Sequence, residues 1–195
     1  MINQARSAVM SMLLFSAILG GAYPAVVTAA GGAIFPSQAE GSLVRDAAGT
    51  VVGSRLIGQA TSAPQYLWPR PSAAGDGYNA AGSSGSNLGP LNPDLIDRVA
   101  ADAQVVRSYA PEGAIPPDAV TTSGSGLDPQ ISPEYAALQV ERIAGARGIA
   151  AAAVDAAIAA NTEWPLLGFI GQPRVNVLMT NLALDAAQPP PAASE

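Results

Sequence analysis

The sequence has no cysteine, no histidine and no lysine, because all nine of its basic residues are arginine. Thiolate and imidazole metal sites, disulfide bonds and a Ser-His-Asp triad are therefore excluded. Without lysine the chain also lacks the residue that forms Schiff bases and the lysine of a Walker phosphate loop. Any chemistry falls to Asp, Glu, Ser, Tyr, Arg or the backbone, so we expect no catalytic residues and no bound metal.

Charge is scarce as well. Only 12% of the residues are charged, about half of the roughly 25% that is usual in globular proteins. The net charge is −6, whereas phosphate binding requires clustered Lys and Arg, so the composition argues against a nucleic-acid partner. The length of 195 residues suits one domain of moderate size with a further segment attached.

That further segment is an uncharged run of 33 residues between Arg6 and Glu40, and a helix needs roughly 20 apolar residues to cross a bilayer core. Its densest part, residues 8–19, is short enough for a signal peptide, with a small-residue cleavage site at residues 28–30. The length of the run, and the tolerance of membrane helices for Gly and Pro, favour an uncleaved anchor. Both interpretations keep Arg6 in the cytoplasm and export the acidic remainder.

Short predicted strands and helices are interspersed after this segment, which indicates an α+β (mixed α/β) soluble domain preceded by a single N-terminal transmembrane helix. The Pro-rich end of the chain is expected to be disordered. The expected divisions are a cytoplasmic N-terminus (residues 1–6), a transmembrane helix (7–30), a linker (31–41), the α+β domain (42–186) and a disordered tail (187–195).

Several short apolar runs are bounded by turn residues, as is typical of strands. Residues 43–45 and 51–57 predict a β-hairpin with a loop longer than two residues. Further extended segments are expected at residues 66–68, 119–122 and 168–170, and a long Pro-, Gly- and Ser-rich loop at residues 69–93.

Helix starts are marked by a capping residue directly before a proline. Asn92-Pro93 predicts one such start, followed by an apolar stripe and ended by Pro111. Further helices are expected from Ser132 to Gly148 and over residues 150–160, whereas residues 175–184 fit either a strand or a short helix capped by Asn176.

Few residues outside these elements suggest a binding or catalytic role. Two Ser/Gly-rich loops, residues 83–90 and 123–126, could form anion-binding nests, but they lack GxGxxG and Walker spacing, so we favour plain polar turns. Arg70 would hold a carboxylate or phosphate ligand, or pair with an Asp of its own domain, the interpretation we favour. Asp128 has no visible catalytic partner, so a turn-forming role is favoured over that of a general base. Trp68 and Trp164 are expected as core residues or interface anchors rather than stacking platforms.

A series of motifs runs along residues 20–185: Gly20-Gly21-Ala22-Tyr23-Pro24, Leu56-Ile57-Gly58-Gln59, Arg70-Pro71-Ser72-Ala73, Ser86-Asn87-Leu88-Gly89-Pro90, Gly126-Leu127-Asp128-Pro129, Arg142-Ile143-Ala144, Ala146-Arg147-Gly148, Pro173-Arg174-Val175-Asn176-Val177 and Asn181-Leu182-Ala183-Leu184-Asp185. Each motif alone is unspecific, but in this order they resemble the C subunit of the Kdp potassium-transporting ATPase, the KdpC family. One departure is Gln130, where that family commonly has histidine, so a titrating or metal-binding role there is not expected.

The resemblance implies a non-catalytic accessory subunit of an ATP-driven, high-affinity potassium uptake complex. Its implied partners are a potassium-pore subunit, an ATP-hydrolysing subunit and the lipid membrane. The family's C subunit is described as an assembly factor and as a catalytic chaperone that raises the ATP affinity of the hydrolysing subunit. The resemblance also implies a single-pass protein of the bacterial inner (plasma) membrane, with the N-terminus in the cytoplasm and the domain outside.

ATP is the one cofactor that the resemblance raises, and we expect none bound tightly by this chain. If its loops bound ATP directly, Arg70 would hold phosphate oxygens and Gln59 would hydrogen-bond ribose or base, with Ser86 and Asn87 as further candidates. Cytoplasmic ATP cannot reach an exported domain, so we expect an indirect effect carried by the membrane helix. The alternatives from other classes are an exported independent hydrolase that uses Asp and Ser, and an exported domain that binds a small ligand.

Overall fold

A computed structural model describes residues 2–46 and 48–188, and the chain divides between Val52 and Gly53 into two compact units. Residues 189–195 of the expected tail lie outside the described residues, so its disorder stays a prediction. The combination of an N-terminal apolar helix with a mixed helix and strand remainder confirms the fold class expected from the sequence.

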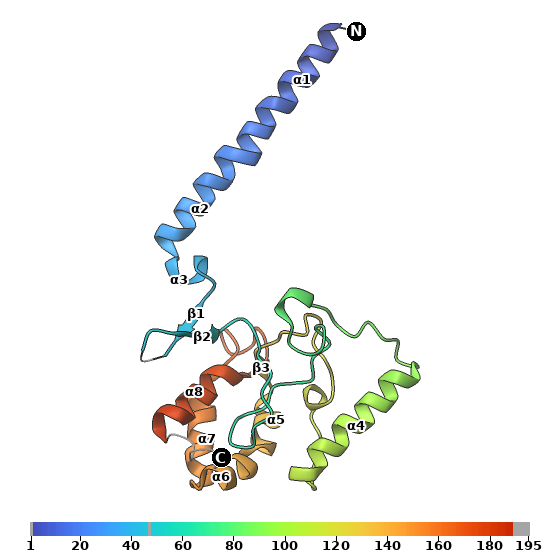
Figure 1. Ribbon diagram of the computed structural model, residues 1–195, viewed down its shortest axis with the longest axis vertical. Coiled ribbons are helices and arrows are strands. Elements are labelled where there is room, and N and C mark those ends of the chain that lie inside the picture. The colour runs from blue at the N-terminus through green and yellow to red at the C-terminus, as the bar shows by residue number, and fades with distance from the viewer. Residues whose placement is uncertain (1, 47, 189–195) are drawn as a thin grey trace. The chain divides into compact units, whose positions relative to one another are not determined.

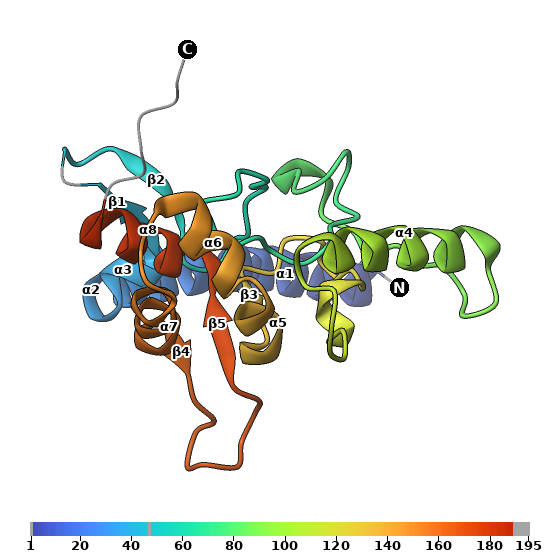
Figure 2. The ribbon, with the colours of Figure 1, turned by 90° about the horizontal axis from the view of Figure 1, so that it is seen from below.

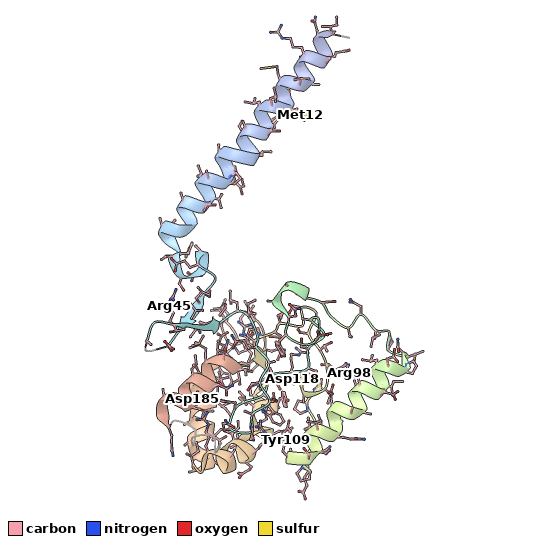
Figure 3. The ribbon with its side chains drawn as sticks, viewed as in Figure 1. Met12, Arg45, Arg98, Tyr109, Asp118 and Asp185 are labelled. Atoms are coloured by element: carbon pink, nitrogen blue, oxygen red, sulfur yellow. The ribbon has the colours of Figure 1, made fainter. Side chains whose placement is uncertain are left out.

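The first unit is dominated by one long helix. Its parts are α1 (Ile2–Ala17), a π-helical segment η1 (Ile18–Ala22) and α2 (Tyr23–Ile34), which run as one rod (Figure 1). The rod has 33 residues, a mean hydropathy of 1.7 over its most apolar stretch and no buried side chain in that stretch. Side chains such as Met12 point away from the helix axis (Figure 3). This helix is long and apolar enough to cross a bilayer, and it extends beyond residues 7–30 at both ends.

The π-helical segment has a local cause in Pro24. Because proline has no N–H, it cannot donate the α-helical hydrogen bond to the Gly20 carbonyl. The N–H of Tyr23 instead reaches back five residues to the Ile18 carbonyl. Single π-helical turns of this kind are frequent at functional sites.

The predicted hairpin is present as a two-stranded sheet of β1 (Leu43–Arg45) and β2 (Val51–Ser54). Asp46 closes its turn, because the backbone N–H of Asp46 donates to the Thr50 carbonyl at 3.0 Å and its carboxylate accepts from the Thr50 N–H at 2.8 Å. The second strand ends at Ser54 rather than at residue 57. A short helix, α3 (Pro36–Ala39), precedes the hairpin.

The helices of the second unit begin where the sequence predicts. The side chain of Asn92 caps α4 (Pro93–Tyr109) by accepting from the Asp94 N–H at 2.8 Å. The helix expected from Ser132 to Gly148 is interrupted at Gln139. The side chain of Gln139 is fully buried and hydrogen-bonds to the backbone of Trp68. The remaining helices are α5 (Pro133–Leu138), α6 (Val140–Arg147), α7 (Ala151–Ala160) and α8 (Val177–Ala187).

A small antiparallel sheet completes the second unit. β5 (Arg174–Asn176) lies between β3 (Gln130–Ile131) and β4 (Thr162–Glu163). The ambiguous residues 175–184 combine both predicted forms, because the strand β5 passes directly into α8. Asn176 makes the change by accepting a hydrogen bond from the Met179 N–H at 3.0 Å.

Three expected strands are wrong. Residues 119–122 begin with the last residue of a 3-10 turn, η3 (Pro117–Ala119), that consecutive prolines favour by fixing φ. Residues 168–170 form part of a tight turn in which Gly168 has a φ of 80°. Residues 66–68 pair with no strand among the described residues, and side chains satisfy much of their backbone instead.

The core of the second unit gathers apolar side chains from all of its helices. Figure 1 and Figure 2 show α4 on the opposite side of the unit from α6, α7 and α8. Trp164 lies outside this core with 73% of its surface exposed, so its assignment as a core residue is wrong. The core residues are Leu67, Val106, Ala119, Ile131, Tyr135, Ala136, Val140, Ile143, Ala144, Val154, Ile158, Val175, Val177 and Leu184.

Candidate functional site

Side-chain amides hold residues 66–68 in place of a neighbouring strand. The Asn181 side chain accepts from the Leu67 N–H at 2.7 Å and donates to the Leu67 carbonyl at 3.0 Å. The buried Gln139 amide does the same for Trp68, at 2.8 and 3.1 Å. Each amide therefore gives one residue both of the backbone hydrogen bonds that a neighbouring strand would otherwise supply.

Two arginines extend this clamp, which we define as Gln139, Arg142, Arg147 and Asn181 around residues 64–68. Arg142 donates to the Pro64 and Tyr66 carbonyls at 2.6 and 3.1 Å. Its guanidinium lies 3.7 Å from the centroid of the Trp68 ring. Burial lowers the pKa of Arg142 to about 10, because desolvation disfavours the charged form.

Arg147 is the most deeply buried charge of the clamp, with 1% of its side chain exposed. It pairs with Asp185 at 2.7 Å and donates to the Gln65 carbonyl at 2.7 Å. The Tyr66 hydroxyl donates to the other oxygen of Asp185 at 3.2 Å. The clamp therefore joins α6 and α8 to residues 64–68 through one connected network.

Arg70 pairs with Asp128, as the favoured interpretation predicted. The two groups lie 3.1 Å apart, and the Arg70 guanidinium also donates to Thr121 and to the Thr122 carbonyl at 3.1 to 3.4 Å. Asp128 also forms a turn, because its second oxygen accepts from the Gln130 N–H at 3.0 Å. The donors of Arg70 are thus directed at groups of its own domain.

The two Ser/Gly-rich loops pack against each other as polar turns. The Ser84 N–H and the Ser83 hydroxyl both donate to the Ser125 carbonyl, at 3.0 and 2.9 Å. Gly126 adopts a φ of 67° in this contact, a left-handed conformation that favours glycine. These contacts favour the polar-turn interpretation of the two loops, which stays a prediction.

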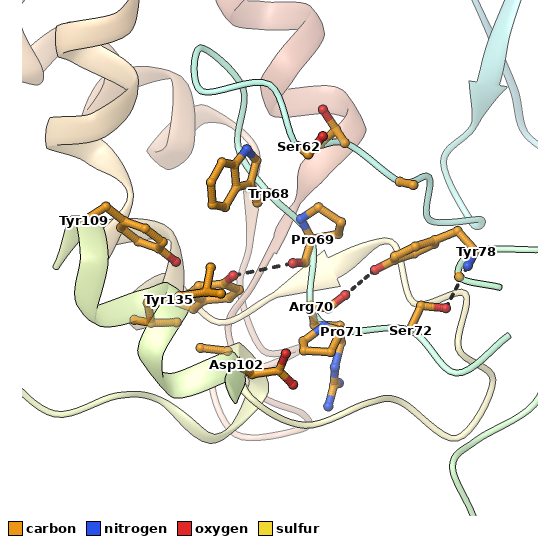
Figure 4. Close-up of a pocket in the computed structure, with 16 residues that line it drawn as sticks. Ser62, Trp68, Pro69, Arg70, Pro71, Ser72, Tyr78, Asp102, Tyr109 and Tyr135 are labelled. Atoms are coloured by element: carbon orange, nitrogen blue, oxygen red, sulfur yellow. Dashed lines mark hydrogen bonds between the residues drawn. The ribbon is translucent and has the colours of Figure 1, made fainter. Parts of the chain in front are cut away.

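A cavity of about 520 Å³ lies beside the clamped segment (Figure 4). Tyr78 fixes one wall by donating to the Arg70 carbonyl at 2.6 Å. Asp102 is the one carboxylate among the lining residues, and it pairs with Arg98 at 2.9 Å. Burial raises the pKa of Asp102, while the charge of Arg98 opposes that shift. The other large lining side chains are Trp68, Pro69, Arg70, Pro71, Tyr109 and Tyr135.

The candidate nucleotide residues lie in different places. Arg70 lines the 520 Å³ cavity, and Gln59 lines a second cavity of about 230 Å³ together with Tyr66, Asn181 and Asp185. Ser86 is half-buried and Asn87 is exposed, and neither lines these two cavities. The structure brings only Gln59 and Arg70 to cavity walls, and nucleotide contact by any of the four residues stays a prediction.

Above about pH 10 the domain is expected to lose stability. Burial raises the pKa of Tyr78, Tyr109 and Tyr135 above the ordinary value of 10.0. Above that value the folded chain retains phenolic protons that the unfolded chain has released, so the free energy of unfolding falls as the pH rises. The lowered pKa of Arg142 has the opposite sign and offsets part of this fall.

Denaturant unfolding of the full chain between about pH 9 and about pH 11, followed together with tyrosinate absorbance, measures this effect. The Tyr78→Phe variant, which keeps the ring and removes one titrating group, should show a shallower pH dependence. Stability that increases over this range would contradict the prediction.

Most of the clamp was missed by reasoning from the sequence. Gln139 and Asn181 have no charge and no special spacing, so nothing in the local pattern predicts their long-range hydrogen bonds to Trp68 and Leu67. Arg142 and Arg147 stand in the quoted motifs without a predicted role. Their spacing of five residues on one predicted helix gave no sign that both reach residues 64–68.

Comparison with known proteins identifies the family. The chain matches the family described as KdpC, K⁺-transporting ATPase, c chain, over residues 5–186. It is 58% identical over 195 residues to the potassium-transporting ATPase KdpC subunit of Caulobacter vibrioides strain NA1000 / CB15N, covering 100% of this chain and 99% of that one. The chain belongs to the KdpC family.

Other KdpC subunits match along nearly their full length. The potassium-transporting ATPase KdpC subunit of Beijerinckia indica is 55% identical over 191 residues, covering 97% of this chain and 96% of the relative. That of Geobacter sulfurreducens is 51% identical over 189 residues, covering 96% of this chain and 100% of the relative. The resemblance stated from the ordered motifs is therefore confirmed.

Within this KdpC chain, several motif residues that carried the resemblance belong to the clamp or contact it. Arg142, Arg147, Asn181 and Asp185 all bind residues 64–68 or each other. Among the described residues, no group of three or more carboxylates is arranged to hold a metal ion. The motifs thus position a structural network beside the 520 Å³ and 230 Å³ cavities.

Proposed function

We propose that this KdpC chain is a non-catalytic accessory subunit that stabilises the assembly of a potassium-pore subunit with an ATP-hydrolysing subunit. The observation that carries the proposal is the 33-residue apolar helix with no buried face, in a chain that matches KdpC subunits along its whole length. Such a helix requires lipid or the helices of other subunits around it. The Asp102 carboxylate in the 520 Å³ cavity is paired with Arg98, which disfavours the alternative of an independent hydrolase.

Co-purification tests this assembly role. The full chain, extracted from membranes in mild detergent, should retain two large subunits that mass spectrometry identifies as the pore and the hydrolysing subunit. Purification of the chain alone under conditions that preserve the other two as a complex would contradict the proposal. Potassium-independent hydrolysis of a model ester by the purified chain would favour the hydrolase instead.

The topology of the proposed subunit follows from its charges. Arg6 is the one charged residue of the apolar helix and lies near its N-terminal end, and the positive-inside rule places it in the cytoplasm. The helix then crosses the bacterial inner membrane, and the acidic domain lies outside. Protease added to intact spheroplasts should digest the domain and leave an N-terminal fragment. A mature chain that begins near residue 31 would instead show that the segment is a cleaved signal peptide.

The catalytic-chaperone effect on ATP affinity is proposed to be indirect. The Arg70 donors already meet Asp128, Thr121 and Thr122, and the carboxylate in the same cavity disfavours a triphosphate. The membrane helix would instead contact two conformations of the hydrolysing subunit differently, which is the requirement for coupling. Couplings of this kind amount to about 1–3 kcal/mol, or roughly 5- to 150-fold in affinity.

Calorimetry of the full chain in detergent, with and without ATP, separates direct from indirect action. No saturable heat is expected for the chain alone, whereas its addition to the other subunits should lower their dissociation constant for ATP. Saturable binding that Gln59→Ala abolishes and Gln65→Ala preserves would establish a direct site and overturn the indirect mechanism.

The Gly21→Leu variant is expected to weaken assembly several-fold while leaving membrane insertion intact. Small residues let helix backbones approach closely, and such packing drives helix association in lipid. Nothing lies within 4 Å of a Cβ at Gly21, so the chain itself tolerates the larger side chain. Ile18→Leu in the same π-helical segment is the matched control. If both variants co-purify with the partner subunits as well as the natural chain does, Gly21 is not a packing face.

A further inference from the structure

The loop between β4 and β5 exposes a dense group of apolar side chains. We call residues 164–170 the apolar loop, and Figure 2 shows the segment between these strands extending away from the sheet. Its large side chains lie on the surface, although residues of these types are usually buried. The exposed fractions are 73% for Trp164, 68% for Leu166, 76% for Leu167, 75% for Phe169 and 52% for Ile170.

The backbone of this loop forms its own hydrogen bonds. Leu166 and Ile170 exchange both N–H to carbonyl bonds, at 3.1 and 3.0 Å, and the Gly168 N–H donates to the Pro165 carbonyl at 3.0 Å. A loop that satisfies these groups internally avoids much of the penalty of taking polar backbone into an apolar phase. The tip of the loop can therefore transfer from water into an apolar phase at a reduced cost.

Charge is confined to the base of the loop. No charged residue occurs between Glu163 and Arg174, and these two residues pair at 2.9 Å where β4 ends and β5 begins. Arg55 lies 3.8 Å from the other oxygen of Glu163, so the base carries three charged groups. The hairpin therefore changes from charged at its base, through Trp164, to wholly apolar at its tip.

We infer that the apolar loop inserts into the interface of the lipid bilayer, as a second membrane contact of the domain. This gradient matches a membrane surface, where Trp prefers the headgroup level and Leu and Phe lie deeper. A stable protein interface requires about 800 Å² on each partner and a polar rim around its apolar centre. A single convex loop without polar side chains at its tip fits lipid better.

The anchor helix keeps lipid within reach, so this inference rests on the membrane anchoring proposed above. A domain tethered to the bilayer meets it at a high effective concentration, so even a small insertion adds to binding without a separate association step. Because the contact is apolar, it does not require anionic lipid. It is expected in vesicles of pure phosphatidylcholine.

Site-directed spin labelling tests the inference, because the natural chain has no cysteine to compete for the label. Leu167→Cys carries the label at the tip, with Leu166→Cys as a second loop position. Glu112→Cys, in an exposed polar loop of the same unit, is the aqueous control. Leu14→Cys, near the middle of the expected span, reports on the anchor helix. Each labelled full chain is assembled with its partner subunits in phosphatidylcholine vesicles, and its collision with oxygen and with a water-soluble nickel chelate is measured.

The expected result is that labels at Leu167 and Leu166 collide more with oxygen than with nickel, as lipid-exposed sites do, while the label at Glu112 shows the reverse. Preferential collision with nickel at both loop positions would place the loop in water and overturn the inference. Low collision with both reagents would show that the loop docks on a protein subunit, which also overturns it. Leu14 separates these outcomes from failure of the anchor, because a helix outside the bilayer would make Leu14 nickel-accessible.

Discussion

The Arg147→Met variant is expected to lose about 3–5 kcal/mol of unfolding free energy, the range found when one partner of a buried ion pair is removed. The Arg147 side chain is 1% exposed, and its loss leaves Asp185 without its cation. It also leaves the Gln65 carbonyl without the donor that lies 2.7 Å from it. Because Asp185 is 33% exposed, water compensates part of the lost attraction, which favours the lower end of that range.

Arg174→Met provides the matched control. Arg174 also pairs with a carboxylate at 2.9 Å, but its side chain is 55% exposed. Exposed pairs contribute only about 0.2–1 kcal/mol, so this variant should unfold close to the natural chain. Chemical unfolding of the full chain in detergent, followed by tryptophan fluorescence, measures both. Equal losses in the two variants would show that burial of Arg147 adds nothing to its contribution.

The Gly126→Ala variant is expected to lose about 3 kcal/mol or more, as the sum of two penalties. A left-handed conformation costs a non-glycine residue roughly 1–2 kcal/mol, and overpacking costs about 1–3 kcal/mol. A Cβ at Gly126 would lie 2.6 Å from the Ser84 carbonyl oxygen and 2.7 Å from the Ala74 nitrogen, both of them backbone atoms. The two Ser/Gly-rich loops would have to separate to admit it.

Gly124→Ala, two residues earlier in the same loop, is the control for Gly126→Ala. Nothing lies within 4 Å of a Cβ at Gly124, and its φ is not left-handed. Substitution at such a site changes stability by about 0.4–1 kcal/mol, often favourably, because it reduces the freedom of the unfolded chain. Similar unfolding midpoints for the two variants would show that the contact between the loops is loose.

Local signals predicted the helices well and the strands poorly. Asn92 and Ser132 cap helices where the sequence placed them, because a capping side chain acts within three residues of its own position. Strands depend on partners that are distant in sequence, as Val175 shows by pairing with both Ile131 and Thr162. Residues 66–68 have the apolar composition of a strand, but their partners are side chains that no periodicity identifies.

The site was predictable only in part, for the same reason. Arg70 was expected to meet an Asp of its own domain, but Asp128 is 58 residues away, and only the fold brings the two together. The inward turn of Gln139 needed the structure, because a buried amide has no sequence signature. The sequence said more about Trp164. This residue lies in an uncharged run, and it was expected to be either a core residue or an interface anchor. Its exposure excludes the core.

The length of the N-terminal helix has a consequence for the membrane surface. At 1.5 Å per residue, its 33 residues extend about 50 Å, whereas the hydrocarbon core is about 30 Å thick. This mismatch is too large for tilt alone at the average of about 20°, so roughly two turns or more must stand outside the hydrocarbon. In the topology proposed above, which places Arg6 at the cytoplasmic headgroups, the protruding part would be the narrow, alanine- and glycine-rich stretch after Val27. A slender helical stalk of this kind would occupy little lateral space among neighbouring subunits at the membrane surface.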